Sequence, residues 1–330
     1  MRARVIRMAR RPDGVPVEED FAFETLDLPA PADGEALVRL QAISLDPYIR
    51  LRMAGRHLVG NLSPGDMISS EMVGVVVESR SQSLRPGAMV AGFAPWCDLA
   101  VLRDSELRPL PAFDLPATLT LGILGMPGLT AYAGITRILQ PGPEDVLVVS
   151  AAAGPVGATV GQLASLRGAT VIGIAGGPKK CLWLKEVAGF SAAIDHRNGQ
   201  VAEALLGLAP DGPTAYFDNV GGDLLRTVLG VLRPYGRIAL CGIIADYNSN
   251  TRAPGPEPLE IISRRATLSG LVVYDHEDLS AEWEREGARL IRAGDLHYLE
   301  DITEGLDGAP TAFARLMRGE NVGKSLVRLD

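Results

Sequence analysis

The stretch Val146–Ala164, VLVVSAAAGPVGATVGQLA, decides the predicted fold, because an apolar strand leads through a turn of small residues into a helix. The turn contains Gly154 and Gly157, Gly161 follows one helical turn later, and Ala152 stands where a GxGxxG motif has its first glycine. Small residues let the backbone approach a pyrophosphate, and the N-terminus of a helix attracts an anion. The pattern predicts a dinucleotide site. The alternative is a purely structural glycine turn.

Apolar, β-rich runs alternate with helical stretches from Asp145 onward, which makes a repeated βα unit. This alternation is typical of a parallel, doubly wound sheet, so the fold class is α/β. The predicted strands are Val146–Ser150, Thr170–Ala175, Ala192–Ile194, Ala215–Asn219 and Arg237–Cys241, with a sixth apolar run at Thr267–Val273. The predicted helices between the first five strands are Val156–Arg167, Lys180–Ala188, Val201–Leu206 and Asp223–Leu232.

The two ends of the chain lack the βα alternation of the middle part. Residues 1–120 consist of short β-rich pieces between Gly and Pro turns, which predicts a compact antiparallel barrel or sandwich. Near the other end we expect an amphipathic helix at Ser280–Ala293, and a turn followed by a strand in Gly319–Asp330, which we assign to the first domain. The clearest early strands are Glu35–Ala42, Met72–Glu78 and Met89–Phe93, and a largely helical segment is expected after Gly128.

Composition narrows the class of protein. The 330 residues are 47% hydrophobic and 22% charged, as in globular proteins, and the net charge of −8 argues against a nucleic-acid or anionic-membrane partner. Three widely spaced cysteines, Cys97, Cys181 and Cys241, suit a reducing compartment better than a disulfide framework. Neither a signal-peptide pattern nor an uncharged apolar run of about 20 residues is present, so we expect a cytoplasmic protein.

The residues after the second strand favour NADPH over NADH. An NAD-binding protein usually has an acidic residue here for the ribose 2′-hydroxyl. This chain instead continues from Ala175 with Gly-Gly-Pro and then Lys179 and Lys180. A lysine would pair with a 2′-phosphate, whereas a carboxylate would repel it. The alternative is that both lysines are a solvated helix start, although lysines at an N-terminus oppose the helix dipole.

Several phrases, in order along nearly the whole chain, carry a more specific signal. Besides the glycine turn, the phrases are DPYIR (46–50), GMPGLTAY (125–132), GGPKKC (176–181), YFDNVGG (216–222), GRIALCGI (236–243) and NVGK (321–324). Together they resemble the alkenal/enone double-bond reductase branch of the zinc-independent medium-chain dehydrogenase/reductase superfamily. That branch includes prostaglandin reductases, plant alkenal reductases and bacterial curcumin-reductase-like proteins.

The resemblance implies a two-domain protein with NADP(H) as cofactor and a small enone or enal as substrate. A Rossmann dinucleotide-binding domain would span residues 123–294. A β-rich, GroES-like catalytic domain would combine residues 1–122 and 295–330. The resemblance also implies a homodimer.

Matching phrases assign site residues. Gly154, Pro155, Val156 and Gly157 would hold the pyrophosphate, and Lys180, preferred to Lys179 through the resemblance alone, would hold the 2′-phosphate. The other implied cofactor contacts are Met126, His196 (where relatives often carry Tyr), Asn219, Cys241, Gly242, Ile243, Tyr247, Leu271, Val272, Val273 and Asn321, with Tyr48 and Met126 near the nicotinamide or substrate. Plainer interpretations stay open: a turn tyrosine at Tyr48, a turn cap at Asn219, a core thiol at Cys241, a surface loop at His196, and packing at Tyr274.

Metal ligands are missing from the segments that would carry catalytic zinc in zinc alcohol dehydrogenases. Those segments contain Ile43-Ser44-Leu45-Asp46 and Ser69-Ser70-Glu71, while His57 and Cys97 are isolated. A four-cysteine lobe for structural zinc is absent as well. Zinc needs three or four converging ligands, so we expect no metal.

Reduction of a conjugated C=C bond fits a site that holds NADPH and no metal ion. A hydride from the nicotinamide would reach the β-carbon, and charge would develop on the carbonyl oxygen. Tyr48, Tyr247 or the nicotinamide ribose hydroxyl would donate to that oxygen. The loops Arg50–Pro64 and Tyr247–Pro258 would build the pocket, the second as a lid or an exposed linker. The alternatives are a quinone reductase of the same superfamily and a non-catalytic NADPH-binding sensor.

Overall fold

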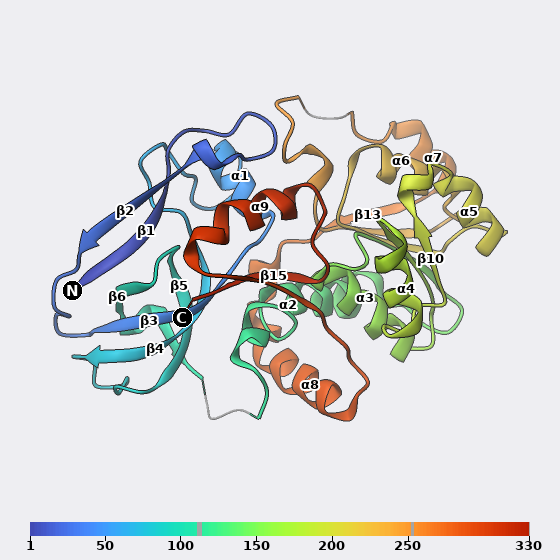
Figure 1. The fold of residues 1–330 in the computed structure, drawn as a ribbon. Helices are drawn as coiled ribbons and strands as arrows, with labels where there is room; N and C mark the ends of the chain where they lie inside the picture. The colour runs from blue at the N-terminus through green and yellow to red at the C-terminus, as the bar shows by residue number, and fades with distance from the viewer. Residues whose placement is uncertain (111–113, 252–253, 330) are drawn as a thin grey trace. The chain divides into compact units, whose positions relative to one another are not determined.

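The computed structural model of the protein describes residues 1–110, 114–251 and 254–329. The chain forms two compact units (Figure 1). The first contains Met1–Gly122 and the residues from Glu300 on, and the second contains Ile123–Leu299. Asp330, the last residue of the strand segment expected near the end of the chain, lies outside the described residues.

The second unit is built on a six-stranded parallel sheet in the order β10-β9-β8-β11-β12-β13. Counted along the chain, this is the order 3-2-1-4-5-6 of a doubly wound dinucleotide-binding fold, which confirms the predicted fold class. Strands β8, β9 and β11 are almost fully buried, which explains why they read as continuous apolar runs. The strands are β8 (Val146–Ser150), β9 (Thr170–Ala175), β10 (Ala192–Asp195), β11 (Ala215–Asp218), β12 (Arg237–Leu240) and β13 (Thr267–Gly270).

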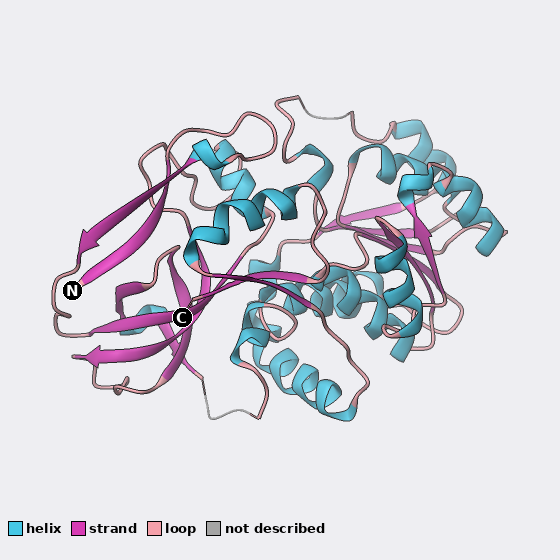
Figure 2. Ribbon diagram, in the orientation of Figure 1, coloured by secondary structure: helices cyan, strands magenta, loops and turns pink. Residues whose placement is uncertain are grey.

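Helices connect and flank these strands (Figure 2). The helices α3 to α6 and α8 occupy the segments predicted from the sequence. Their ends differ from the predicted ones by at most two residues. Two larger differences are that α2 already begins at Met126 and that the sixth strand ends at Gly270, because Val273 begins a 3-10 helix. The bounds are α2 (Met126–Ala133, followed by a π-helical stretch, Gly134–Leu139), α3 (Pro155–Leu166), α4 (Pro178–Glu186), α5 (Val201–Leu208), α6 (Gly222–Val231), α7 (Pro258–Arg264) and α8 (Ser280–Ala293).

A helical element lies at each end of Tyr247–Pro258, the segment that we expected to be a loop. A 3-10 turn, Ile244–Asp246, precedes it, and α7 begins at Pro258. Glu257 and Glu260 form a capping box there, and proline suits the first turn of a helix. Arg252 and Ala253 of this loop lie outside the described residues.

Gly161 shows how closely α3 packs. A Cβ at this position would lie 1.9 Å from Cζ of Phe190, so alanine cannot be added without displacing the ring. We expect Gly161→Ala to lower the free energy of unfolding by about 1–3 kcal/mol through overpacking. The matched control is Gly230 in α6, whose Cβ would meet open space. Gly230→Ala should raise stability by about 0.5–1 kcal/mol through helix propensity. Urea unfolding measures both changes, and equal midpoints for the two variants would contradict this account of the packing.

The first unit contains a seven-stranded sheet in the order β14-β15-β3-β4-β5-β7, with β6 also paired to β3. The pairs are antiparallel except β14 with β15. A separate antiparallel pair is formed by β1 and β2. The strands are β1 (Arg2–Met8), β2 (Phe21–Asp27), β3 (Glu35–Ser44), β4 (Ser69–Ser79), β5 (Met89–Pro95), β6 (Leu99–Arg103), β7 (Leu107–Pro109), β14 (Glu300–Glu304) and β15 (Lys324–Arg328).

Among the described residues of this unit, the α-helices are α1 (Tyr48–Ala54) and α9 (Ala309–Met317). The expectation of a loop over Arg50–Pro64 is therefore wrong in its first part. Pro47 precedes α1, and Gly55 ends it in the left-handed conformation at φ 70°. The consequence is that the side chains of DPYIR are fixed on a helix.

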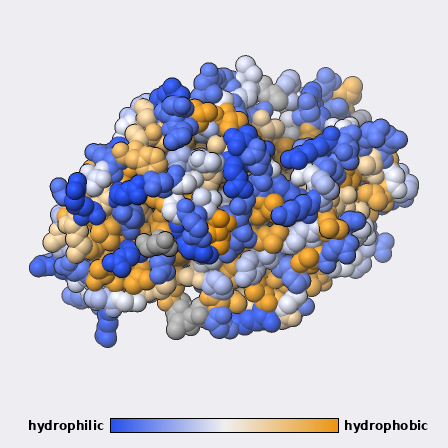
Figure 3. All heavy atoms as spheres, viewed as in Figure 1, coloured by the Kyte–Doolittle hydropathy of each residue, from blue (hydrophilic) through white to orange (hydrophobic). Residues whose placement is uncertain are grey.

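None of the helices in the described parts of the chain is long and apolar enough to cross a membrane. On the face drawn in Figure 3, hydrophilic and hydrophobic residues are interspersed.

Candidate active site

The glycine turn connects β8 to α3. Gly154 caps α3, which begins at Pro155 and Val156, and the Gly154 N–H donates to the carbonyl of Ala151 over 3.0 Å. A Cβ at Gly157 would lie 2.6 Å from that same carbonyl oxygen, so the turn requires glycine there. Only small residues of the turn stand in front of the N-terminus of α3, so a ligand could come close to its backbone N–H groups. This geometry fits a pyrophosphate.

The strand order reverses between β8 and β11, where doubly wound sheets bind their ligands. A buried carboxylate, Asp218, organises this edge. It accepts hydrogen bonds from the hydroxyls of Ser150 (3.0 Å) and Tyr216 (2.6 Å) and from the backbone N–H of Gly221 (3.1 Å). The side-chain amide of Asn219 donates to the carbonyl of Ser150 over 2.8 Å. The predicted site residue Asn219 is thereby held at the end of β8.

Three basic side chains, Lys180, His196 and Arg197, come from the two segments that follow β9 and β10. Cβ atoms built on the glycines after β9 show where two of them lie. At Gly176 the Cβ would be 2.9 Å from Nε2 of His196, and at Gly177 it would be 3.2 Å from Nη1 of Arg197. Desolvation of the imidazole lowers the pKa of His196, and the positive charges of Arg197 and Lys180 lower it further.

Arg197 was missed by the sequence analysis. The available signal was a basic residue directly after the third strand, whose end lies beside the end of the second in this fold. Oδ1 of the neighbouring Asp195 accepts the backbone N–H groups of Gly177 (2.9 Å) and Arg197 (3.0 Å). These hydrogen bonds lower the pKa of Asp195 and tie the two segments together.

The other predicted cofactor residues of the second unit follow β12 and β13, so they lie at the same carboxyl edge of the sheet. A Cβ at Gly242 would lie 3.0 Å from the carbonyl oxygen of Asn219, which shows how closely these two segments approach. Burial raises the pKa of Cys241 to about 12, and nearby Asp218 adds to the effect. Burial also raises the pKa of Tyr247, which is 9% exposed. Ile243 is exposed, Leu271 is buried, and Val272 and Val273 are partly buried.

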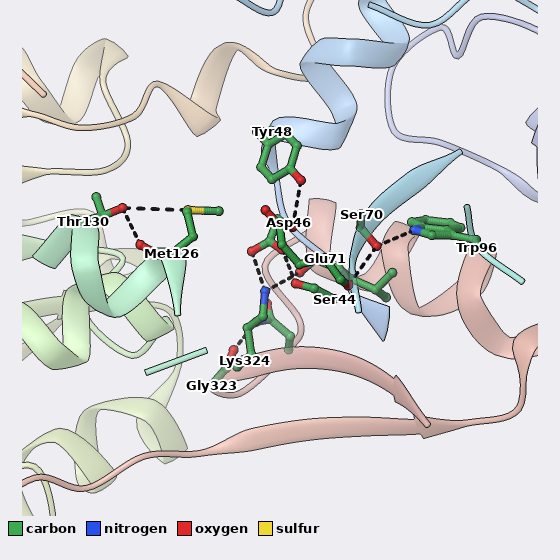
Figure 4. A network of polar contacts seen from close by, with 12 residues as sticks. Ser44, Asp46, Tyr48, Ser70, Glu71, Trp96, Met126, Thr130, Gly323 and Lys324 are labelled. Atoms are coloured by element: carbon green, nitrogen blue, oxygen red, sulfur yellow. Dashed lines mark hydrogen bonds and ion pairs between the residues drawn. The ribbon is translucent and has the colours of Figure 1, made fainter. Parts of the chain in front are cut away.

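Two further residues of the second unit bear on the prediction. Met126 is the first residue of α2, and its carbonyl oxygen and sulfur both accept the hydroxyl of Thr130, over 2.8 and 3.8 Å (Figure 4). Tyr274, left open between substrate contact and packing, is exposed in the 3-10 helix that follows β13.

In the first unit, Tyr48 is held by a carboxyl group. Its hydroxyl donates to Oε2 of Glu71 on β4 over 2.9 Å (Figure 4). The ring also lies 5.3 Å, centroid to centroid, from that of His57. Asn321 is placed in the turn before β15, where its side-chain amide donates to the carbonyl of Gly323 over 2.8 Å. The contact of Tyr48 with Glu71 was not foreseen.

A buried ion pair lies next to this contact. The ammonium group of Lys324 on β15 pairs with the carboxylate of Asp46, which also accepts the hydroxyl of Ser44 (Figure 4). Lys324 additionally donates to the carbonyl of Leu45 over 3.2 Å. Asp46 is 4% exposed and Lys324 is 3% exposed, so both charges depend on each other for compensation.

Within residues 1–110, 114–251 and 254–329, no group of three or more His, Cys, Asp or Glu is placed to hold a metal ion. The three cysteines are all free.

Comparisons with known proteins agree with this geometry. A model described as the N-terminal domain of oxidoreductase matches residues 4–110, and one described as zinc-binding dehydrogenase matches residues 155–289. The NADPH-dependent curcumin reductase of Escherichia coli is 39% identical over 98% of this chain and 95% of its own length. An NADP-dependent 2-alkenal reductase of Nicotiana tabacum is 36% identical over 96% and 94%.

A solved structure is similar over the whole chain. CurA from Vibrio vulnificus, crystallised with NADPH, has a TM-score of 0.93, with 36% identity over 99% of both chains. The fold, the glycine turn and these relatives define an oxidoreductase of the two-domain, nicotinamide-dependent class. The chain belongs to the NADPH-dependent oxidoreductases of the medium-chain dehydrogenase/reductase superfamily, and its cofactor is NADP(H).

Proposed function

We propose that this enzyme reduces the C=C bond of α,β-unsaturated aldehydes or ketones. The observation that carries the proposal is the Tyr48 hydroxyl, which is held by Glu71 and is a hydrogen-bond donor suited to a carbonyl oxygen. The related curcumin and 2-alkenal reductases support the same substrate class. The proposal assigns catalysis to the first unit and dinucleotide binding to the second. A homodimer and a cytoplasmic location stay predictions.

The residues of the second unit fit NADPH. The glycine turn and the N-terminus of α3 suit the pyrophosphate, and the basic side chains after β9 and β10 suit the 2′-phosphate. NADPH, when bound, supplies the hydride for the reduction. The other proposed contacts are Met126, Asn219, Cys241, Gly242, Ile243, Tyr247, Leu271, Val272, Val273 and Asn321.

Tyr48 has a defined task in this proposal. Negative charge develops on the carbonyl oxygen of the substrate when the β-carbon accepts a hydride. A hydroxyl aimed at that oxygen stabilises the charge. Tyr247 is the second candidate for this role, but its side chain is more deeply buried than that of Tyr48. Replacing each tyrosine by Phe separates the two roles.

The experiment is NADPH oxidation with a panel of acceptors: a long-chain 2-alkenal, a linear enone, the corresponding saturated aldehyde and a quinone. We expect turnover of the alkenal and the enone, with the saturated product identified by mass spectrometry, and none of the saturated aldehyde. Turnover of quinones alone would replace the proposal by a quinone reductase. Tight NADPH binding without oxidation by any acceptor would instead indicate a sensor.

A further inference from the structure

The pairing of Tyr48 with Glu71 raises a question of hydrogen-bond direction. A phenol has one hydrogen, and an ionised carboxylate can only accept. If Glu71 is ionised, it takes the Tyr48 hydrogen at 2.9 Å, and the hydroxyl has none left for a substrate. If Glu71 is protonated, the carboxylic acid can donate to the phenol oxygen and leave the phenol hydrogen available.

We propose that Glu71 is a positioning residue that carries a proton during catalysis and thereby turns the Tyr48 hydroxyl into a donor for the substrate oxygen. The inference rests on the proposed function, because it concerns the same reaction. It adds the residue that decides whether Tyr48 can act.

The surroundings of Glu71 favour the protonated form. Burial raises the pKa of Glu71, and the carboxylate of Asp46 raises it further, while Lys324 and the hydrogen bond from Tyr48 act in the opposite direction. The charge of Lys324 is already engaged by Asp46 in the buried pair, so it compensates a second carboxylate poorly. Burial, with the neighbouring Glu71 and Asp46, also raises the pKa of Tyr48, so the phenol retains its hydrogen.

Charged and titratable groups from several elements surround the Tyr48–Glu71 pair. Arg52, one helical turn along α1, lowers the pKa of Tyr48, and the ring of His57 lies beside that of Tyr48. On the neighbouring strand β5, the residue paired with Glu71 is Phe93, which does not titrate. The titratable neighbours are therefore Asp46, Lys324, Arg52 and His57.

The proposed step balances in protons and electrons. The β-carbon gains the hydride that bound NADPH would supply, so that the substrate is reduced as the cofactor is oxidised, and the C=C electron pair moves to give an enolate. The Tyr48 O–H bond breaks as its proton passes to the enolate oxygen, which gives an enol. The enol becomes the saturated carbonyl compound when its α-carbon takes a proton from solvent and its O–H proton leaves to solvent. The Glu71 O–H bond breaks as its proton passes to the phenol oxygen, which restores Tyr48. The Glu71 carboxylate then takes a proton from solvent, and the saturated carbonyl product leaves.

The test is the pH profile of kcat for the wild type and Glu71→Gln, with an enone as substrate. Activity of the wild type should be high while Glu71 is protonated and fall about tenfold per pH unit above its raised pKa. Glutamine can donate to the phenol oxygen at any pH but cannot pass on a proton. We therefore expect Glu71→Gln to lower kcat about tenfold, leave KM for the enone similar, and lose this alkaline decline. Tyr48→Phe should lower kcat about 10²–10⁴-fold.

Controls distinguish this role from a structural one. Glu78→Gln changes an exposed charge on the same strand and should keep the wild-type profile. Infrared spectroscopy of the free enzyme should show a protonated carboxyl band that is lost as the pH rises through the pKa of Glu71 and is missing in Glu71→Gln. An unchanged alkaline decline in Glu71→Gln, or the absence of that band, would overturn the proposal. Because the band is measured without substrate, it is independent of whether enones are turned over.

Discussion

Replacing Lys324 by methionine is expected to lower the free energy of unfolding by about 3–5 kcal/mol, because it leaves a buried carboxylate without its counter-charge. Asp46 lies at the end of β3 and is buried together with the ammonium group that neutralises it. Methionine fills a similar volume, so the loss comes from the charge and not from a cavity. Denaturant unfolding with the wild type alongside measures the change.

Two comparisons make this prediction specific. The double variant Asp46→Asn with Lys324→Met removes both charges and should recover part of the lost stability. Arg328→Met provides a matched control, because Arg328 lies on the same strand and pairs over 2.8 Å with Glu304 where both side chains are more than half exposed. It should cost about 0–1 kcal/mol. Equal losses in Lys324→Met and Arg328→Met would show that burial does not control the strength of the pair.

Removing the basic side chains after β9 and β10 should change the choice of cofactor. Charge-assisted hydrogen bonds are worth about 1.5–3 kcal/mol each, so Lys180→Ala and Arg197→Ala should each lower kcat/KM for NADPH about 10- to 150-fold. The values for NADH should stay nearly the same, because NADH lacks the 2′-phosphate. The double variant should lose more than either single variant. Steady-state kinetics with both cofactors measures the effect.

Lys179 provides the control for this prediction, since it is exposed on the same turn of α4. Lys179→Ala should keep most of the NADPH preference. If Lys180→Ala or Arg197→Ala lowered kcat/KM equally for NADPH and NADH, the residue would support the fold and would not bind the 2′-phosphate.

Much of the second unit could be predicted from the sequence, because β8, β9 and β11 are almost fully buried and α3 and α4 begin at a glycine followed by a proline. The first unit was harder. Helix α1 has seven residues and starts inside the phrase DPYIR, so it leaves too short a periodic pattern to recognise. In β13 the apolar run continues three residues beyond the strand, because Leu271 is buried whether or not it pairs.

Local phrases predicted individual residues but not their partners. Tyr48 meets Glu71 only because β4 passes beside the start of α1, and Arg197 meets Gly177 only because β10 lies beside β9. Such contacts depend on sheet order, which no short phrase contains. The roles assigned to the individual site residues stay predictions until the variants are measured.

The position of β15 has a consequence for folding during synthesis on the ribosome. This strand lies between β14 and β3, and it carries the counter-charge of Asp46. On the ribosome, residues 123–299 are complete before β15 has been made, so the second unit can acquire its structure first. Until β15 is made, the edge of β3 that pairs with it stays open, and the carboxylate of Asp46 has no counter-charge from Lys324. We expect nascent chains to expose this half to chaperones until Lys324 emerges.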